Sequence, residues 1–387
     1  VTGVGTSSSA AVSGQPSVRR DVGRVVSDAI VLMPTDAAVT CTQPTANPVD
    51  YTEKPAPFAL TSDTVRQNGA SRRLPPRPTH VMSAYRTDHL PALPCHLNGE
   101  ITTLPEARVS PLDRGFIFGD GVYEGISVYG RGGQTPRPFR FEQHMARLER
   151  SLKETRIPNP HTPEQWRQIA LELIAAYAQA PDALRPQPQD WFYYLQVTRG
   201  VALRDHPMLP GLTPTVFATC LPLTSPTLAQ RTQGVACVSA DDFRWKKAHI
   251  KSISLLGAVF ARQISFEQGA LETVMFRDGF LSEAAASNVW VVKDGQVMGP
   301  PKDHLVLEGI RYGLIEELCR GAGIGFDLRR IAKAEVLVAD ELLLSSATKE
   351  VLPITRLDDQ PVGNGQAGPV YQKLYAAYQQ AKEASLA

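Results

Sequence analysis

The sequence has no excess of charge of either sign and no long apolar run. Its 387 residues include 40 basic and 39 acidic side chains, which gives a formal net charge of +1. Such a balance offers no electrostatic footprint for nucleic acid or for an anionic membrane surface. No apolar run approaches the roughly 20 residues that are needed to span a bilayer. We therefore expect neither nucleic acid nor a membrane among the partners.

Paired cysteines and metal-binding motifs are also missing. The eight histidines are scattered without an HExxH pattern, and there is no CxxC pair. The five cysteines are odd in number and widely separated: Cys41, Cys95, Cys220, Cys237 and Cys319. These absences argue against a disulfide framework and against a zinc site, so we expect no metal. A reduced cytoplasmic protein is the simplest interpretation.

Residues 1–81 have little that could form a core. They are rich in Ser, Thr, Gly, Pro and Ala, and their few apolar residues follow no sustained period. Such a segment buries too little apolar surface to offset the entropy lost on ordering. The chain begins with Val1, whereas Met82 opens the part with a regular pattern. We predict that residues 1–81 are a disordered or untranslated extension and that the natural start is Met82.

The whole chain of 387 residues is 43% apolar and can bury a sizeable core. After residue 81, two amphipathic helices are predicted first. The first covers residues 141–155, with Phe141, Met145, Leu148 and Leu152 on one face. The second begins after Thr162, which forms a capping box with Gln165, while Pro163 suits the first turn. Its buried stripe is Trp166, Ile169, Leu173, Ile174 and Tyr177.

The later pattern mixes short strands with helices. Strands are predicted at residues 191–198, 234–240, 271–277 and 288–293, and helices at 252–268, 309–320 and 369–382. Asp278-Gly279 and Asp294-Gly295 are hairpin-type turns. With a Pro-rich crossing near residues 222–231, we predict an α/β (α+β) protein of two domains. The smaller domain covers residues 82–226 and the larger one 227–387.

Lys251 and Glu283 are the candidates for catalytic chemistry. Lys251 precedes an apolar, helix-forming run, where partial burial favours a neutral amine that can act as nucleophile and base. Glu283 stands among small residues that let a flat ring approach, and it could keep a pyridine nitrogen protonated. Taken alone, the two segments are more typical of a surface lysine before an ordinary helix and of a solvated turn glutamate.

Three further features suggest ligand contact. Residues 113–124 place three glycines among aromatics, as expected where backbone runs close to a ligand or a facing subunit, or where a tight loop packs on itself. Residues 196–206 end a strand with Arg199, Arg204 and His206, which suits carboxylate capture or a solvated loop. Arg147 binds a phosphate or is a surface charge on its helix.

Taken together and in order, these segments resemble the class IV (fold type IV) pyridoxal-phosphate aminotransferases. Within that family the sequence is most similar to the D-amino acid aminotransferases. The resemblance covers about residues 95–383, and it rests on RGFIFGDGVYE, EQHMARL, YLQVTRGVALRDH, IKSISLLGA, SEAAASNVW and LEGIR. It implies the type IV fold, with a larger, pseudobarrel-like C-terminal domain that binds pyridoxal 5'-phosphate.

The resemblance also implies roles for particular residues. Lys251 forms the internal aldimine with the cofactor and moves the proton at Cα. The other cofactor contacts are Glu283 at the pyridine nitrogen, Arg147 at the phosphate, Leu307 at the ring face, the backbone of Ile310 and Arg311, and the Ser346–Ala347 segment. Tyr123, Arg204 and His206 form the substrate-carboxylate trap. In the family the Arg and His come from the other subunit, so a homodimer is implied.

The sequence departs from the family at the phosphate end. The family usually has Thr where this chain has Arg311, and again where it has Ala347. Two hydroxyl donors are therefore missing. Either Arg311 or Thr348 could replace them, and the sequence leaves both open.

Three activities are compatible with the sequence. The residues of the trap favour transamination between a D-amino acid such as D-alanine and a 2-oxo acid such as 2-oxoglutarate. A branched-chain L-amino acid aminotransferase shares the scaffold, and the two differ in which side of the site holds the carboxylate. Aminodeoxychorismate lyase is the third, although that family usually has Arg-Gly-Tyr where this chain has Arg204-Asp205-His206.

A protein that begins at Met82 is expected to match the longer chain in Tm and in activity, because residues without a core contribute little to stability. Thermal unfolding and turnover of the two forms check this prediction. A large loss of either property in the shorter form would show that the extension contains a docked segment.

Overall fold

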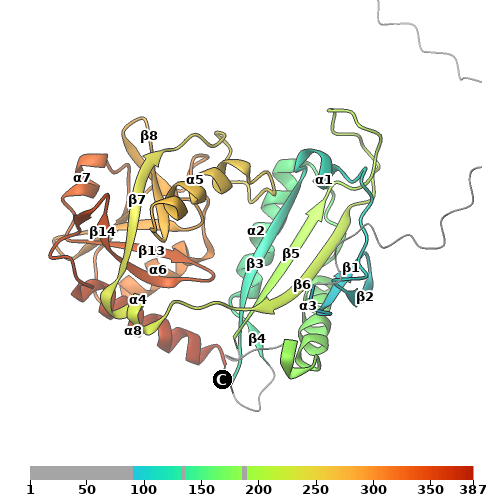
Figure 1. Ribbon diagram of the computed structural model, residues 1–387, viewed down its shortest axis with the longest axis horizontal. Helices are drawn as coiled ribbons and strands as arrows, with labels where there is room; N and C mark the ends of the chain where they lie inside the picture. The colour runs from blue at the N-terminus through green and yellow to red at the C-terminus, as the bar shows by residue number, and fades with distance from the viewer. Residues whose placement is uncertain (1–89, 132–135, 185–189, 387) are drawn as a thin grey trace, which may run out of the picture. The chain divides into compact units, whose positions relative to one another are not determined.

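The computed structural model of the protein describes residues 90–131, 136–184 and 190–386. The predicted extension 1–81 and Met82 lie outside the described residues. Within them, the chain forms two sheets, one before and one after residue 226 (Figure 1). The predicted domain boundary at residues 226–227 falls just before helix α4, and the domain division itself stays a prediction.

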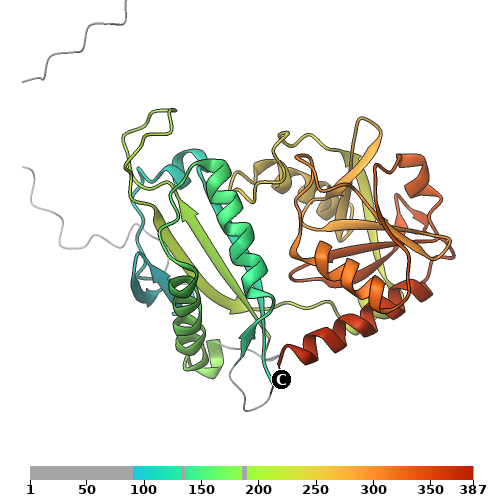
Figure 2. The same ribbon diagram turned by 180° about the vertical axis from the view of Figure 1, so that it is seen from behind.

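The first sheet is antiparallel throughout, with the strand order β2-β1-β6-β5-β3-β4. Its strands are β1 (Pro94–Leu97), β2 (Glu100–Thr103), β3 (Gly121–Tyr129), β4 (Arg137–Pro138), β5 (Trp191–Thr198) and β6 (Thr215–Pro222). Its helices are α1 (Arg114–Phe118), α2 (Phe141–Thr155) and α3 (Pro163–Ala178), with a short 3-10 turn at Asp182–Leu184. Helices α2 and α3 cover one face of this sheet (Figures 1 and 2).

The predicted helices and strand of this part are confirmed. Helix α2 spans the predicted residues, and the predicted apolar faces of α2 and α3 are buried against the sheet. The side chain of Thr162 accepts from the N–H of Gln165, whose side chain accepts from the N–H of Thr162, so the capping box has formed. Strand β5 has the predicted bounds.

The second sheet is mixed, with the order β12-β11-β10-β13-β14-β7-β8-β9 and β15 paired to β14. Its strands are β7 (Val235–Asp241), β8 (Glu272–Arg277), β9 (Phe280–Ala284), β10 (Asn288–Lys293), β11 (Gln296–Gly299), β12 (Phe326–Leu328), β13 (Glu341–Ser346), β14 (Glu350–Leu357) and β15 (Gln360–Pro361). The helices of this part are α4 (Leu228–Gln233), α5 (Leu256–Glu267), α6 (Ile310–Gly321), α7 (Lys333–Leu337) and α8 (Pro369–Ala384). Both predicted turns are hairpins, with positive φ at Asp278-Gly279 and Asp294-Gly295.

Chain length forces this sheet to curl. Only residues 285–287 connect β9, at one end of the order, to β10. That link reaches at most about 14 Å. Five strand spacings separate β9 from β10 along the sheet, and a flat sheet would need about 24 Å. The sheet therefore closes toward a barrel, in agreement with the predicted pseudobarrel.

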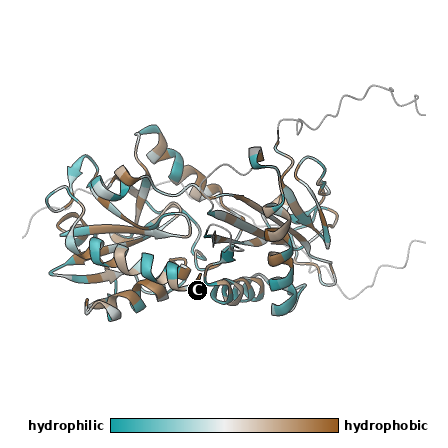
Figure 3. Ribbon diagram, turned by 90° about the horizontal axis from the view of Figure 1, so that it is seen from below, coloured by the Kyte–Doolittle hydropathy of each residue, from teal (hydrophilic) through white to brown (hydrophobic). Residues whose placement is uncertain are grey.

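Both faces of the curled sheet are buried, and alternate side chains fill them. Val289 and Val291 of β10 join one apolar cluster, to which β7, β8, β9, β11, β13 and β14 also contribute. Trp290 and Val292 point to the other face, where α6 and α8 pack. Figure 3 shows apolar residues along the strands and polar faces on the helices. Strands of this sheet and the segments that leave it contribute part of the site.

Candidate active site

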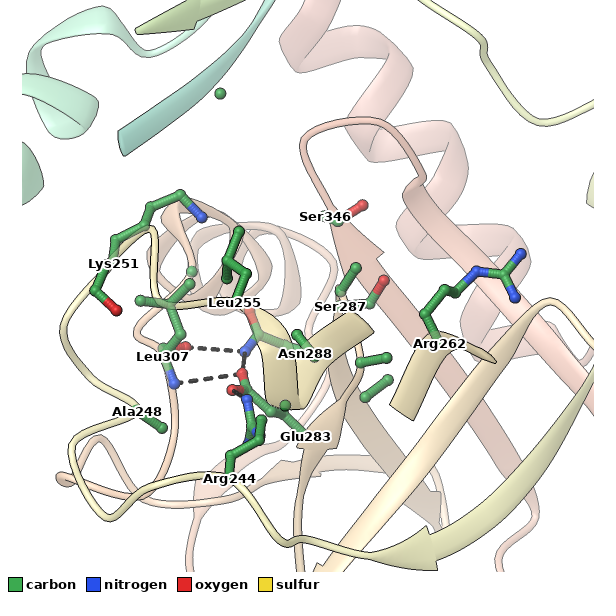
Figure 4. Close-up of a pocket in the computed structure, with 18 of the residues that line it drawn as sticks. Arg244, Ala248, Lys251, Leu255, Arg262, Glu283, Ser287, Asn288, Leu307 and Ser346 are labelled. Atoms are coloured by element: carbon green, nitrogen blue, oxygen red, sulfur yellow. Dashed lines mark hydrogen bonds and ion pairs between the residues drawn. The ribbon is translucent and has the colours of Figure 1, made fainter. Parts of the chain in front are cut away.

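A cavity of about 900 Å³ brings the predicted cofactor residues together. Its lining includes Tyr123, Arg147, Lys251, Glu283, Leu307, Ile310, Arg311, Ser346 and Ala347. These residues come from β3, α2, β9, the N-terminus of α6 and the end of β13, as well as from the connecting segments. Arg204 and His206 lie elsewhere, on an exposed loop before β6. Figure 4 shows Lys251 and Glu283 on different walls of the cavity.

Lys251 lies in a short non-helical segment that forms a β-bridge with β3. Its carbonyl accepts from the N–H of Tyr123 at 3.0 Å, and the N–H of Ile253 donates to Gly121 at 3.0 Å. The predicted helix start at residue 252 was therefore wrong, because the backbone bonds of this segment go to β3; α5 begins at Leu256. The amine Nζ lies 4.1 Å from the centre of the Tyr123 ring, in the cavity.

Glu283 is a buried residue of β9, not a turn residue, and its side chain is held from three directions. The Arg244 guanidinium donates to Oε1, while Oε2 accepts from Asn288 Nδ2 at 3.2 Å and from the N–H of Leu307 at 3.3 Å (Figure 4). Burial raises the pKa of Glu283, and the adjacent Arg244 opposes that shift. Asn288 also donates to the Leu307 carbonyl at 2.9 Å, which fixes the Leu307 segment beside the carboxylate.

Arg244 has no counterpart among the predicted residues. Its Nε and Nη2 groups bond to Asp242 at 2.9 Å, so the arginine is shared between two carboxylates. No local pattern indicates it, because Arg244 and Glu283 lie 39 positions apart. The pairing of β7 with β8, and of β8 with β9, brings them together.

Arg147 is a buried ion-pair residue and not a surface charge of its helix. It donates to both oxygens of Glu124, from Nε at 2.8 Å and from Nη2 at 2.7 Å, and from Nη1 to the Glu308 carbonyl at 3.1 Å. His144 Nδ1 lies 2.7 Å from the same carboxylate. Burial raises the pKa of Glu124, but Arg147 and His144 outweigh it and hold that pKa far below its usual range. Burial lowers the pKa of His144 to about 4, so its ring is neutral near pH 7.

The N-terminus of α6 forms another part of the wall. The first N–H groups of a helix have no partner within it, so those of Ile310 and Arg311 remain available to an anion. Gly309 precedes them, and a Cβ there would clash with Asn288 Oδ1. The segment Ser346–Ala347 closes the same end, where Ser127 Oγ donates to the Ala347 carbonyl at 2.6 Å.

The glycines of residues 113–124 pack against the chain itself. A Cβ on Gly115 would clash with the Thr198 side chain, and one on Gly121 would lie 2.6 Å from the Val197 carbonyl. Both glycines therefore allow close packing on β5, and the expected approach of this segment to a ligand or a facing subunit stays a prediction. The segment also contributes Tyr123 to the cavity.

Arg204 and His206 are organised although they are exposed. Arg114 donates to the carbonyls of Asp205, at 2.5 Å, and of His206, at 3.3 Å. The Phe118 ring lies 5.3 Å from the His206 ring and 5.4 Å from the Arg204 guanidinium carbon. The loop thus has a defined shape outside the cavity of its own chain.

The described residues therefore combine a lysine amine, a buried carboxylate and a basic end with free helix N–H groups. This set fits a flat anionic cofactor with a reactive carbonyl, a ring nitrogen and a phosphate. No helix within the described ranges has both the length and the apolar character that crossing a membrane requires.

Comparison with known proteins identifies the class. Residues 121–357 match the family model for amino-transferase class IV. The chain belongs to the class IV aminotransferase family and is an aminotransferase of fold type IV.

Two curated relatives illustrate the similarity in sequence. The D-alanine aminotransferase of Bacillus licheniformis is 36% identical over 282 residues, which is 73% of this chain and 94% of the relative. That of Staphylococcus epidermidis strain ATCC 12228 is 30% identical over 284 residues, covering 73% and 95%.

Solved structures agree on the fold. The branched-chain amino acid aminotransferase from Escherichia coli has a TM-score of 0.65 at 23% identity, covering 75% of this chain and 94% of that one. The branched-chain aminotransferase from Thermoproteus uzoniensis, solved with norvaline, has a TM-score of 0.66 at 24% identity, covering 74% and 94%. A fold IV transaminase from Curtobacterium pusillum has a TM-score of 0.60 at 25% identity, covering 72% and 92%.

Replacing the buried carboxylate, Glu124→Gln, should destabilise the cofactor-free protein at pH 7 by about 3 kcal/mol or more, because it leaves the buried Arg147 without a counter-ion. Since the folded-state pKa of Glu124 is depressed, its contribution is complete above the unfolded-state pKa of about 4.3 and is lost as the pH falls below it. Urea unfolding measures the difference.

The matched control is Glu142→Gln on the same helix, where an exposed pair with Arg167 is lost. Its expected cost is at most about 1 kcal/mol. Equal stabilities of Glu124→Gln and the wild-type protein would contradict the assigned ion pair.

Proposed function

We propose that this aminotransferase moves the amino group between a D-amino acid, such as D-alanine, and a 2-oxo acid, such as 2-oxoglutarate, with pyridoxal 5'-phosphate as cofactor. The observation that carries the proposal is the cavity that the Lys251 amine, the Glu283 carboxylate and the basic end at Arg147 share. The curated relatives named D-alanine aminotransferase, at 30–36% identity, support the substrate class.

The residues present fit the cofactor from end to end. Lys251 would hold it covalently, Glu283 would face the ring nitrogen, and Leu307 would lie against the ring. Arg147, the N–H groups of Ile310 and Arg311, and the Ser346–Ala347 segment would receive the phosphate. Once bound, the cofactor supplies a ring that accepts electrons from the substrate Cα.

Lys251 would also transfer the proton at Cα. Its amine lies over the Tyr123 ring, inside the cavity, so it is confined to one side of the site. A base that is fixed on one side of the site can remove the Cα proton of one enantiomer only, namely the one whose proton points to that side. The side on which the carboxylate is held therefore decides between a D- and an L-amino acid.

Tyr123, Arg204 and His206 are the proposed carboxylate trap. Because Arg204 and His206 lie outside the cavity of their own chain, the proposal requires a homodimer in which they enter the partner's site. Apolar side chains beside the loop support an interface, since Phe116 is 77% and Leu203 is 80% exposed. A cytoplasmic location is part of the proposal, and it fits the four described cysteines, which are free and buried.

The cofactor assignment predicts a yellow protein whose long-wavelength band is removed by borohydride, which fixes the cofactor to a peptide that contains Lys251. Lys251→Ala should lose both this labelling and turnover, because it removes the nucleophile and the proton carrier together. Absorbance spectra and peptide mass mapping provide the measurement. Lys247→Ala, at an exposed neighbouring lysine, should keep both properties. A colourless wild-type protein that takes up no added cofactor would remove the proposed function.

The substrate assignment predicts that D-alanine reacts with 2-oxoglutarate faster than L-alanine, L-leucine or L-valine does. Arg204→Ala should raise KM for all α-amino acids by roughly 30-fold or more, the range for losing one partner of a desolvated charge pair. Steady-state kinetics with a substrate panel checks both points, with the exposed Lys373→Ala as the control. Faster turnover of L-leucine than of D-alanine would instead make the chain a branched-chain enzyme.

A further inference from the structure

The side chain of Arg311 is an unusual buried cation. It stands in the first turn of α6, lines the cavity and is only 2% exposed. Its Nη2 donates to Ser127 Oγ and to Tyr378 Oη, both at 3.1 Å, and its Nη1 lies 3.4 Å from His144 Nε2. Its Nε is buried and has no hydrogen-bond partner among the described residues. Within the described part of the chain, the hydrogen bonds of this guanidinium therefore go to neutral groups.

The nearby carboxylates are already engaged by other cations. Both oxygens of Glu124 bond to Arg147, and Oε2 also bonds to His144. Because His144 is neutral and its Nδ1 faces a carboxylate, Nδ1 carries the proton and the Nε2 lone pair faces Arg311. Arg147 and Arg311 thus have one carboxylate between them.

The negative charge of Glu350 also raises the pKa of Arg311, but it cannot balance the positive charge that remains in the cluster. Its Oε2 lies 2.9 Å from Arg231 Nη2, and its Oε1 lies 3.6 Å from Lys382 Nζ. The cluster of Arg147, Arg311, His144 and Glu124 keeps an excess of one positive charge. A buried charge of this kind is costly unless an anion meets it.

The cluster stands directly behind the anion end of the cavity. Ser127, which accepts from Arg311, donates to the Ala347 carbonyl, and the Arg311 backbone is itself in the open first turn of α6. We propose that the Arg311 side chain supplies the missing counter-charge for the cofactor phosphate and makes the site select a phosphorylated ring over an unphosphorylated one. This inference rests on the proposed function. The positive charge of Arg311 would replace the two hydroxyl donors that are missing at the phosphate end of the site.

The test compares two ligands that differ only in the phosphate. In Arg311→Met, the affinity of the cofactor-free enzyme for pyridoxal 5'-phosphate should fall roughly 30-fold or more, while the affinity for pyridoxal changes less than about threefold. Arg311→Lys, which keeps the charge, should retain more of the preference. Arg320→Met, at an exposed arginine of the same helix, is the matched control and should match the wild type.

Stability gives a second readout. Without cofactor, Arg311→Met should melt at the same temperature as the wild type or higher, because it removes a buried cation that lacks a counter-ion. Adding pyridoxal 5'-phosphate should then raise its Tm less than it raises that of the wild type. An unchanged preference for pyridoxal 5'-phosphate over pyridoxal in a folded Arg311→Met would overturn the inference.

The wild-type protein tests the same idea without any variant. Inorganic phosphate should raise the Tm of the cofactor-free wild type, because the cluster offers a net positive site. No effect of phosphate would overturn the inference even if Arg311→Met failed to fold. Uptake of inorganic phosphate without uptake of pyridoxal 5'-phosphate would instead remove the proposed function and leave the anion site in place.

Discussion

The need to neutralise one fully buried carboxylate organises much of the site. Glu124 on β3 has no solvent to stabilise its charge, so β3 requires cationic and hydrogen-bonding partners from the elements packed on it. Arg147 and His144 supply them from α2, three positions apart and therefore on one face of the helix. This contact fixes α2 against β3 and points Arg147 into the cavity wall.

The opposite wall contains a second buried carboxylate with different electrostatics. Glu283 has one guanidinium, which it shares with Asp242, and burial dominates, so its pKa is raised while that of Glu124 is lowered. Glu283, which lines the cavity, and Glu124, which lies behind the cavity residues Arg147 and His144, thus differ in how readily they release a proton. The difference comes from how each cation is held: Arg147 donates to Glu124 from two nitrogens and His144 adds a hydrogen bond, whereas Arg244 donates to Glu283 from one nitrogen and to Asp242 from two.

Local patterns predicted the parts of the fold that local interactions determine. The capping box at Thr162 and the two Asp-Gly turns involve residues at most a few positions apart, and all formed as predicted. The Leu342–Leu344 run of β13 was missed, because a strand buried on both faces has no alternation of apolar and polar residues. The start of α5 was misplaced for another reason: the segment after Lys251 pairs with Gly121, a partner that no local pattern indicates.

The site shows the same division. The motif resemblance indicated nine of the residues that line the cavity, including Lys251 and Glu283, but it assigned no role to Arg244 or His144. For His144 a signal existed, since it lies one helical turn from Arg147 on the face turned toward β3. For Arg244 there was none, because its contact with Glu283 depends on the order of strands in the curled sheet.

Under the proposed function, the two ends of the site differ in how they are assembled. The phosphate and ring end is built within one chain on elements that a rigid sheet positions, so it can form before any subunit contact. The carboxylate trap needs Arg204 and His206 from a partner, yet Arg114 already holds the backbone of their loop through two carbonyls. The trap is therefore preorganised, and the loop loses little conformational entropy when the subunits associate. Cofactor uptake would then not require the dimer, whereas transamination would depend on protein concentration.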